Sequence, residues 1–144
     1  MTPEETFERY ARAFEEMTPD TLDDLGQLVG DDLHFVDPFN DLRGREAFLD
    51  IFREMFGRLQ DPAFAVSDAA MGRQAGYLRW CMTFRTKPGG PLWQIDGMSE
   101  LHFGPDGRVT AHIDHWDAGS QFYGKLPGLG WLIERIRRRL SHDG

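Results

Sequence analysis

The chain has 144 residues, of which 40% are hydrophobic and 12% aromatic, so it can bury one hydrophobic core but is too short for two. The formal net charge of −8 argues against a surface that binds nucleic acid through clustered lysines and arginines. Its one cysteine cannot form an internal disulfide. We therefore treat residues 1–144 as a single domain.

The beginning of the sequence, "MTPEETFERY", is acidic and amphipathic, unlike a secretory signal peptide. No window approaches the roughly 18 consecutive apolar residues of a membrane-spanning helix. We expect a cytoplasmic protein without a transmembrane segment.

Helix signals dominate the first part of the chain. Thr2 is a candidate N-cap, Pro3 suits the first helical position, and Glu5 completes a capping box. Apolar residues then recur at helical spacing, with Tyr10 among them. A second short helix is predicted from Leu22 to Val29, ended by Gly30 as a C-terminal cap.

A brief strand follows in "LHFVDPF", where Pro38 stops it. Gly44 precedes a third helix whose end is marked by Asp61-Pro62. Its apolar face consists of Phe48, Ile51, Phe52, Met55, Phe56 and Leu59.

Beyond residue 62 the apolar period changes from about four to two. The runs "AFAVSDAAM", "GYLRWCMTFRT", "PLWQIDGMSELHF" and "GRVTAHIDHWD" resemble strands separated by turn residues, which favours an antiparallel meander. A last helix is predicted at about 129–140. Helices first and strands afterwards indicate an α+β domain, with the helices on one face of a curved sheet.

The order of these elements, with "FERYARAF", "DDLHFVDPF", "GREAF" and "LHFGPDGRVTAHIDHWD", resembles the nuclear transport factor 2-like superfamily, in its SnoaL-like and ketosteroid isomerase-like branch. The resemblance covers nearly the whole chain. It implies a cone-shaped fold in which a strongly curved, mostly antiparallel sheet and three N-terminal helices enclose an apolar pocket, followed by a C-terminal helix. It also implies a homodimer. It leaves the function open, because this fold hosts isomerases, cyclases, dehydratases, epoxide hydrolases and non-catalytic binders.

Two positions match functional residues of the isomerases, and a third departs from them. Tyr10 matches a helical tyrosine that stabilises an oxyanion, and Asp37 matches a general-base aspartate that precedes a proline. Ser99 stands where the isomerases keep a protonated aspartate. Serine is a weaker acid, so the resemblance implies enolisation chemistry more than steroid isomerisation itself.

The segment "HIDHWD" concentrates titratable groups on one predicted strand. Alternation places His112, Asp114 and Trp116 on one face, which the resemblance directs to the pocket. The Cα atoms of His112 and Asp114 would lie about 7 Å apart, a spacing that permits a hydrogen bond. An aspartate that holds a histidine makes an acid/base pair suited to neutral pH. The alternative is a hydrogen-bonded surface pair.

Asp37 has two interpretations. Phe35 and Phe39 on the same side would desolvate its carboxylate and make it a base suited to a carbon acid. Alternatively, Asp-Pro only begins a turn. Tyr10 has a similar alternative, as a core residue without contact to a ligand.

A metal site in "HIDHWD" would need a third ligand, because two residues on one face are too few. His34, His102 and His115 are each expected to point the other way. We therefore expect no metal and no cofactor.

Large apolar residues of the predicted strands and helices would line a pocket for a flat or polycyclic apolar ligand, or would simply form the core. The candidate ligand-binding residues are Ser99, Trp116, Trp80, Trp93, Phe14, Phe35, Leu101 and Phe103.

The C-terminal helix combines an apolar stripe with the arginines of "ERIRRRL". Cations near a helix end complement its dipole, which favours a solvated end. The alternatives are a lid over the pocket, a dimer contact or a membrane-surface helix.

We infer a small cofactor-independent enzyme of the isomerase, cyclase or dehydratase type, acting by general acid/base chemistry on an apolar ketone-like, steroid-like or polyketide-like molecule. Asp37, Tyr10, His112 and Asp114 are the candidate catalytic residues. The alternative is a non-catalytic module of the same fold that binds a hydrophobic ligand or serves in assembly.

Overall fold

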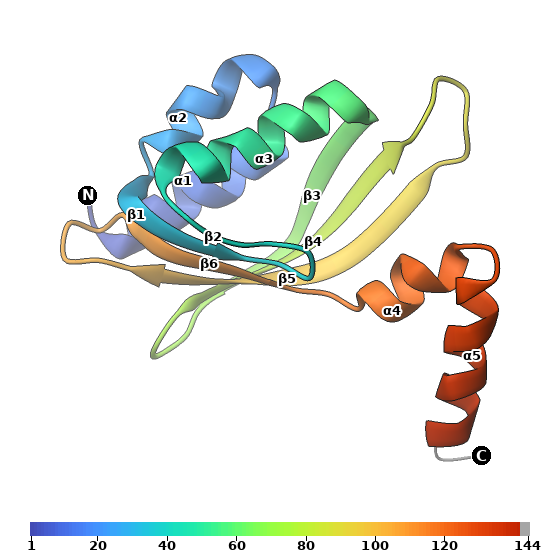
Figure 1. The fold of residues 1–144 in the computed structure, drawn as a ribbon. Coiled ribbons are helices and arrows are strands. Elements are labelled where there is room, and N and C mark those ends of the chain that lie inside the picture. Colours follow the sequence, from blue (N-terminus) through green and yellow to red (C-terminus); the bar gives the residue numbers. More distant parts are fainter. Residues whose placement is uncertain (142–144) are drawn as a thin grey trace.

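The computed structural model describes residues 1–141, in which helices α1, α2 and α3 cover one face of a curved, unclosed sheet (Figure 1). The α+β class and the arrangement of the N-terminal helices agree with the sequence prediction. The elements are α1 (Pro3–Glu15), η1 (Pro19–Thr21), α2 (Leu22–Gly26), β1 (Val29–Val36), β2 (Asp41–Arg43), α3 (Arg45–Arg58), β3 (Gln60–Met71), β4 (Gly76–Arg85), β5 (Trp93–Phe103), β6 (Val109–His115), α4 (Ala118–Gln121), η2 (Tyr123–Lys125) and α5 (Leu129–Leu140).

The predicted capping box at the start of α1 is confirmed. The Glu5 backbone N–H donates to Thr2 Oγ1 over 3.1 Å, and the Thr2 backbone N–H donates to Glu5 Oε2 over 3.2 Å. These bonds satisfy backbone donors that a helix N-terminus leaves free. The helix therefore begins at a defined residue, and its buried face carries Phe7, Tyr10 and Phe14.

Two predicted boundaries are wrong. Helix α2 ends at Gly26, and Val29 already belongs to β1, because the backbone at this point pairs with β6 through Val109. Pro62 lies inside β3 instead of marking the end of the third helix. A proline fits there because β3 is an edge strand whose register with β4 is irregular between Gln60 and Ala63.

The strand order in the sheet is β2-β1-β6-β5-β4-β3. Strands β3 to β6 form the predicted antiparallel meander, while β1 pairs in parallel with β6, and the short β2 adds an edge strand that the sequence did not indicate. The parallel pairing places Phe35 of β1 beside His112 of β6. Residues that lie far apart in the sequence thus become neighbours on one face of the sheet.

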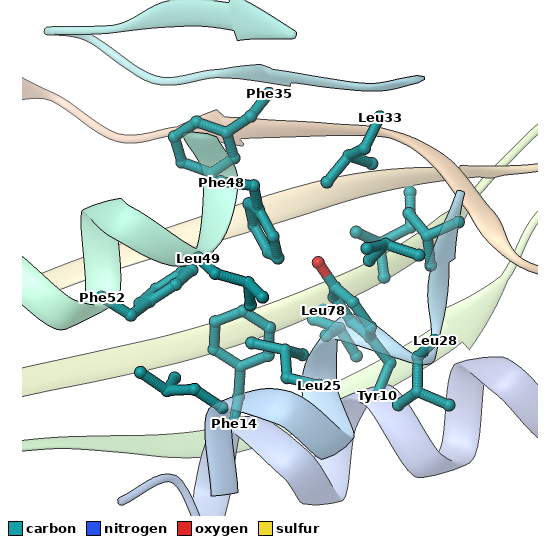
Figure 2. Packing of buried hydrophobic residues seen from close by; sticks show 14 of the residues in the cluster. Tyr10, Phe14, Leu25, Leu28, Leu33, Phe35, Phe48, Leu49, Phe52 and Leu78 are labelled. Atoms are coloured by element: carbon teal, nitrogen blue, oxygen red, sulfur yellow. The ribbon is translucent and has the colours of Figure 1, made fainter. Parts of the chain in front are cut away.

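The hydrophobic core lies between this face and helices α1 and α3. Figure 2 shows side chains from the helices and from the sheet pointing towards one another, with the Tyr10 oxygen directed away from the backbone of α1. The largest of the almost fully buried side chains are Tyr10, Phe35, Phe48, Leu25, Leu33, Leu49, Leu78 and Leu101.

The predicted helix at 129–140 is confirmed as α5. It extends away from the sheet and from α1–α3, and it packs mainly against α4 and η2 (Figure 1). Within residues 1–141, no helix is both long enough and apolar enough to cross a membrane.

Candidate active site

His112 and Asp114 lie two residues apart in β6, a central strand, so both side chains point to the helix-covered face. His112 Nε2 and Asp114 Oδ1 are 2.7 Å apart, a direct hydrogen bond. The side chains are 3% and 17% exposed, respectively. His112 and Asp114 therefore lie at the edge of the core and do not belong to the solvated surface.

Tyr10 approaches His112 from the other side of the imidazole ring. Its hydroxyl lies 2.6 Å from His112 Nδ1, in a fully buried setting. Burial raises the pKa of Tyr10 well above its usual value, and the charge of Asp114 raises it further. The phenol therefore stays protonated. An Nε2–H that donates to the Asp114 carboxylate leaves Nδ1 as an acceptor, and in this tautomer the phenol donates to Nδ1.

A second chain of donors reaches Asp114 from β5 and β4. Ser99 stands opposite Asp114 in the register of β5 with β6, and its Oγ donates to Asp114 Oδ1 over 2.5 Å. Trp80 Nε1 donates in turn to Ser99 Oγ over 2.9 Å. The hydrogen bonds from His112 and from Ser99 both end on Asp114 Oδ1. No donor within residues 1–141 bonds to Asp114 Oδ2.

Aromatic rings surround the imidazole. Four ring centroids lie 5.1 to 5.8 Å from that of His112. Such packing leaves His112 little freedom to rotate, so its hydrogen bonds have fixed directions. The rings belong to Tyr10, Phe14, Phe35 and Phe48.

A small cavity of about 30 Å³ opens beside this network. It has room for one or two water molecules, far less than the several hundred Å³ of a typical pocket for a drug-sized ligand. A steroid-sized molecule would require its wall side chains to move. The cavity is lined by Phe14, Phe52, Phe64, Val66, Leu78, Trp80, Ser99, His112 and Asp114.

Five of the sequence-predicted site residues therefore meet at one cavity: Phe14, Trp80, Ser99, His112 and Asp114. Four lining residues were missed: Phe52, Phe64, Val66 and Leu78. Helical spacing did place Phe52 on the inner face of α3, and alternation in β3 puts Phe64 and Val66 on one side, but neither pattern indicates which core residues border a cavity.

The other predicted ligand-binding residues lie near this cavity or elsewhere in the core. Phe35 packs on His112, and Leu101 is fully buried opposite His112 in the register of β5 with β6. Further away, Phe103 meets Phe7, Trp93 stacks on Phe84 and Trp116 contacts Phe39. These three residues thus contact other aromatic side chains and do not line the cavity.

Asp37 is not brought to the cavity. Its Oδ1 accepts hydrogen bonds from the backbone N–H groups of Phe39 and Asn40, each over 2.7 Å. The Asn40 side-chain amide also donates to both carboxylate oxygens. These bonds close the turn that follows β1, the arrangement that the Asp-Pro alternative described.

The other histidines within residues 1–141 are paired outside the cavity. His34 bonds to Asp41, while His102 and His115 both bond to Glu100 on the opposite face of the sheet. In the described part of the chain, no three His, Cys, Asp or Glu side chains converge as metal ligands.

A larger hollow of about 500 Å³ lies between α1 and α2, beside Arg9, Arg12 and Asp24. It is open to solvent, and its charged side chains are exposed. Groups there are screened by water, which weakens the electrostatic effects that acid/base chemistry needs. The cavity beside Asp114 is therefore the stronger candidate site.

Residues 7–112 match the family model described as the SnoaL-like domain. A comparison with curated proteins gives no match.

Several solved structures have the same fold. An LEH-like epoxide hydrolase of M. tuberculosis is 22% identical with a TM-score of 0.67, and the match covers 92% of this chain and 96% of that one. A ketosteroid isomerase-like protein of Catenulispora acidiphila, solved with trimethylamine, is 16% identical with a TM-score of 0.68, over 84% and 91% of the two chains. SalBIII, an epoxide hydrolase/cyclase-like enzyme of pyran ring formation in polyether salinomycin, is 14% identical with a TM-score of 0.66, over 80% and 90%.

Proposed function

The chain belongs to the SnoaL-like domain family, and from this premise we propose that it is an enzyme in which Asp114 acts as a general base on a small carbonyl compound. The reaction would be of the isomerase, cyclase or dehydratase type, each of which begins with removal of a proton. Solved proteins of this fold include enzymes named as an epoxide hydrolase and a putative polyketide cyclase. These names motivate a catalytic function, and the site residues are taken from this chain alone.

The observation that carries the proposal is the one-sided hydrogen bonding of Asp114. Oδ1 accepts from both His112 and Ser99, whereas Oδ2 has no donor in the described residues and belongs to a side chain that lines an apolar cavity. A carboxylate oxygen in that position can accept a proton from a substrate at hydrogen-bond distance. Its apolar surroundings strengthen the attraction between the carboxylate and that proton.

His112 and Tyr10 act on the substrate through Asp114. Tyr10 holds the imidazole as the Nε2–H tautomer, and the Nε2–H donates to Oδ1 and fixes the orientation of the carboxylate. Both are positioning residues in this proposal. His112 would become a proton carrier only if the substrate reached its ring through the cavity.

Ser99 is placed to stabilise the oxygen charge that develops as the proton leaves. Because Trp80 Nε1–H already donates to Oγ, the Ser99 hydroxyl proton remains available to an acceptor. A protonated Asp114 is a weaker acceptor than the carboxylate. The Ser99 hydroxyl would then turn from Oδ1 to the enolate oxygen in the cavity.

The size of the cavity limits the substrate. About 30 Å³ accepts the reacting end of a molecule and no fused ring system. We propose that a carbonyl group with its neighbouring C–H enters beside Asp114, while the remainder of the substrate lies among the aromatic residues beyond. Phe52 of α3 and Phe64 of β3 would move to admit a larger group.

Hydrogen–deuterium exchange tests this function even while the substrate is unidentified. Cyclic and acyclic enolisable ketones and diketones are incubated with the protein in D₂O, and loss of the α-proton signal is followed by NMR. We expect catalysed exchange for part of the panel and its loss in Asp114→Asn. If every compound exchanges its α-proton as fast without the protein as with it, the proposed catalytic base has no support.

A ligand-binding module without chemistry is the second candidate. The favouring observation is that Tyr10, His112, Ser99 and Trp80 each already have a hydrogen-bond partner, as in a buried polar network with a purely structural role. Native mass spectrometry with ligand extraction distinguishes the two. A ligand released unaltered at every pH supports the binding module, and a converted one supports the enzyme.

A further inference from the structure

The C-terminal helix α5 presents an apolar face that residues 1–141 leave largely exposed. At 100° per residue, this face occupies an arc of about 100° along the helix. None of the residues of α5 is buried, and Leu132, Ile136 and Leu140 are 46%, 49% and 81% exposed. The face consists of Leu129, Leu132, Ile133, Ile136 and Leu140.

Arginines border the apolar face on both sides. By the same helical geometry, Arg137 lies on one side and Arg139 on the other, with Arg135 next to Arg139. The Arg135 guanidinium lies 5.4 Å from the ring centroid of Trp131, whose side chain is highly exposed. Such side chains can bury their stems in an apolar layer and keep their charged ends at its boundary.

The arginines and the tryptophan also form a shallow site. Trp131, Arg135, Arg138 and Arg139 surround an open hollow of about 410 Å³, together with Glu134. Glu134 pairs with Arg137 and Arg138, whereas Arg135 and Arg139 have no ion pair in the described residues. By the same helical geometry, this hollow faces away from the apolar face, so it does not itself meet a layer that the apolar face enters. The arginines placed to reach phosphate oxygens at that boundary are Arg135, Arg137 and Arg139, which border the apolar face.

The charge of α5 is opposite to that of the chain. Its four arginines and one glutamate give +3, whereas the whole chain carries −8, so the remaining residues carry −11. In Figure 1, α5 extends away from the sheet and from helices α1–α3. An acidic body and a basic helix are therefore separated in space.

We propose that α5 is a docking helix for a membrane surface that contains anionic phospholipids. Its apolar face would enter the boundary of the acyl chains, and its arginines would contact lipid phosphates. At about 18 Å, the helix is too short to span a bilayer, so it would lie in the plane of the interface. The acidic body would remain on the aqueous side.

A second copy of the chain fits this face less well. Pairing of two α5 helices would bring two groups of four arginines together, which is unfavourable. The large apolar side chains exposed on the body are scattered over the first residue, a turn, a loop and different strands: Met1, Phe39, Met71, Tyr77, Leu92 and Met98. They do not form a continuous strip for a helix, whereas a bilayer offers a continuous apolar layer.

Co-sedimentation of the full chain with vesicles tests the proposal. Vesicles of phosphatidylcholine alone are compared with vesicles of phosphatidylcholine and phosphatidylglycerol in equal parts. We expect binding to the anionic vesicles, weakened by salt, and little binding to the neutral ones. Equal binding to both kinds of vesicle, or binding to neither, would overturn it.

Two variants assign the binding to α5. Leu132→Glu with Ile136→Glu is expected to abolish it, and Arg135→Gln with Arg137→Gln and Arg139→Gln, the arginines that border the apolar face, is expected to weaken it by roughly 100-fold, about fivefold per arginine. The matched control is Arg9→Gln with Arg12→Gln and Arg73→Gln, which removes three exposed arginines outside α5. A control that weakens binding as much as the α5 variant would contradict a specific role of this helix.

Folding and self-association are followed in the same samples. Circular dichroism and thermal unfolding should match the parent protein, because all substituted side chains are exposed. Light scattering gives the molecular mass. If the α5 variants lower the mass of the protein and leave vesicle binding unchanged, the partner of α5 is a second copy and the membrane proposal is wrong.

Discussion

The Tyr10 hydroxyl and His112 Nδ1 are 2.6 Å apart, although 102 positions separate the two residues in the chain. This buried contact joins α1 to β6, the last strand along the chain and a central strand of the sheet. It pairs the phenol with the imidazole nitrogen that faces away from Asp114, and it thereby favours the tautomer whose Nε2–H faces that carboxylate.

Replacing Tyr10 by Phe tests this relationship. The substitution keeps the ring in the core but leaves His112 Nδ1 without its donor, which should cost about 1–3 kcal/mol of unfolding free energy. It should also allow the Nδ1–H tautomer, visible in the ¹⁵N shifts of His112. Tyr77→Phe, at a partly exposed tyrosine, is the control for urea unfolding. Unchanged ¹⁵N shifts would contradict the assigned tautomer.

Asp114→Asn should lower turnover by about 100-fold or more once a substrate is known, because an amide cannot accept the substrate proton. The fold should persist, since the amide oxygen can still accept from His112 and Ser99. The kinetic control is Asp37→Asn, which retains an acceptor for the turn after β1. A larger loss of turnover in Asp37→Asn than in Asp114→Asn would transfer the role of base to Asp37.

Gly97→Ala should disturb the hydrogen bonds that run from Trp80 through Ser99 to Asp114, by a steric clash and without any change of charge. A Cβ at position 97 would lie 2.6 Å from the ring of Trp80, which stands opposite Gly97 in the sheet. The indole must move, and its bond to Ser99 must weaken or break, at a cost of about 1–3 kcal/mol. Urea unfolding and tryptophan fluorescence measure both effects. Gly57→Ala, where a Cβ would meet no atom within 4 Å, should not destabilise the protein.

Glu100 should contribute stability in a pH-dependent way. Hydrogen bonds from His102, and then from His115, lower the pKa of Glu100 below its usual value of 4.5. Its stabilisation is therefore complete above the unfolded-state pKa and is lost as the pH falls through the lower folded-state pKa.

Glu100→Gln should accordingly reduce the unfolding free energy by less than about 1 kcal/mol near pH 6, because the partly exposed pairs are screened by solvent. The difference from the parent should shrink as the pH is lowered below 4.5. Urea unfolding across this range measures it, with the exposed Glu54→Gln as the control. A difference that grows with acid would reverse the sign of the assigned pKa shift.

We also propose that the chain forms a homodimer through the outer face of the sheet, as the family resemblance implies. Met98 lies on that face and is 45% exposed. Light scattering at micromolar concentration should give twice the chain mass, and Met98→Glu should lower it. A dimer that persists in Met98→Glu would place the interface elsewhere.

Local patterns in the sequence were enough to predict most of the elements. The capping box at Thr2 located the start of α1, and the change from helical to alternating period located the meander of β3 to β6. Alternation also placed His112 and Asp114 on one face of β6. Boundaries failed where pairing between strands overrode local signals, as at Val29 and Pro62.

The composition of the site depended on tertiary structure. Alternation showed that Ser99 and Trp80 point inward, but only the register of β4, β5 and β6 brings Trp80, Ser99 and Asp114 into one hydrogen-bonded chain. Asp37 shows the converse. The sequence around Asp37 is equally compatible with a general base and with a turn. The backbone N–H groups of Phe39 and Asn40 decide between them, because they bind its carboxylate and close the turn.

By itself, the sequence determined most of the segments that are helices or strands and which side chains share a face, because these properties depend on neighbours a few residues away. Only the tertiary structure decided that Tyr10, His112, Asp114, Ser99 and Trp80 form one network and that the cavity beside them is small. Contacts between residues as distant as Tyr10 and His112 depend on strand order, register and the docking of helices. The spacing of apolar residues along the sequence does not specify strand order, register or helix docking, because these depend on how the whole core packs.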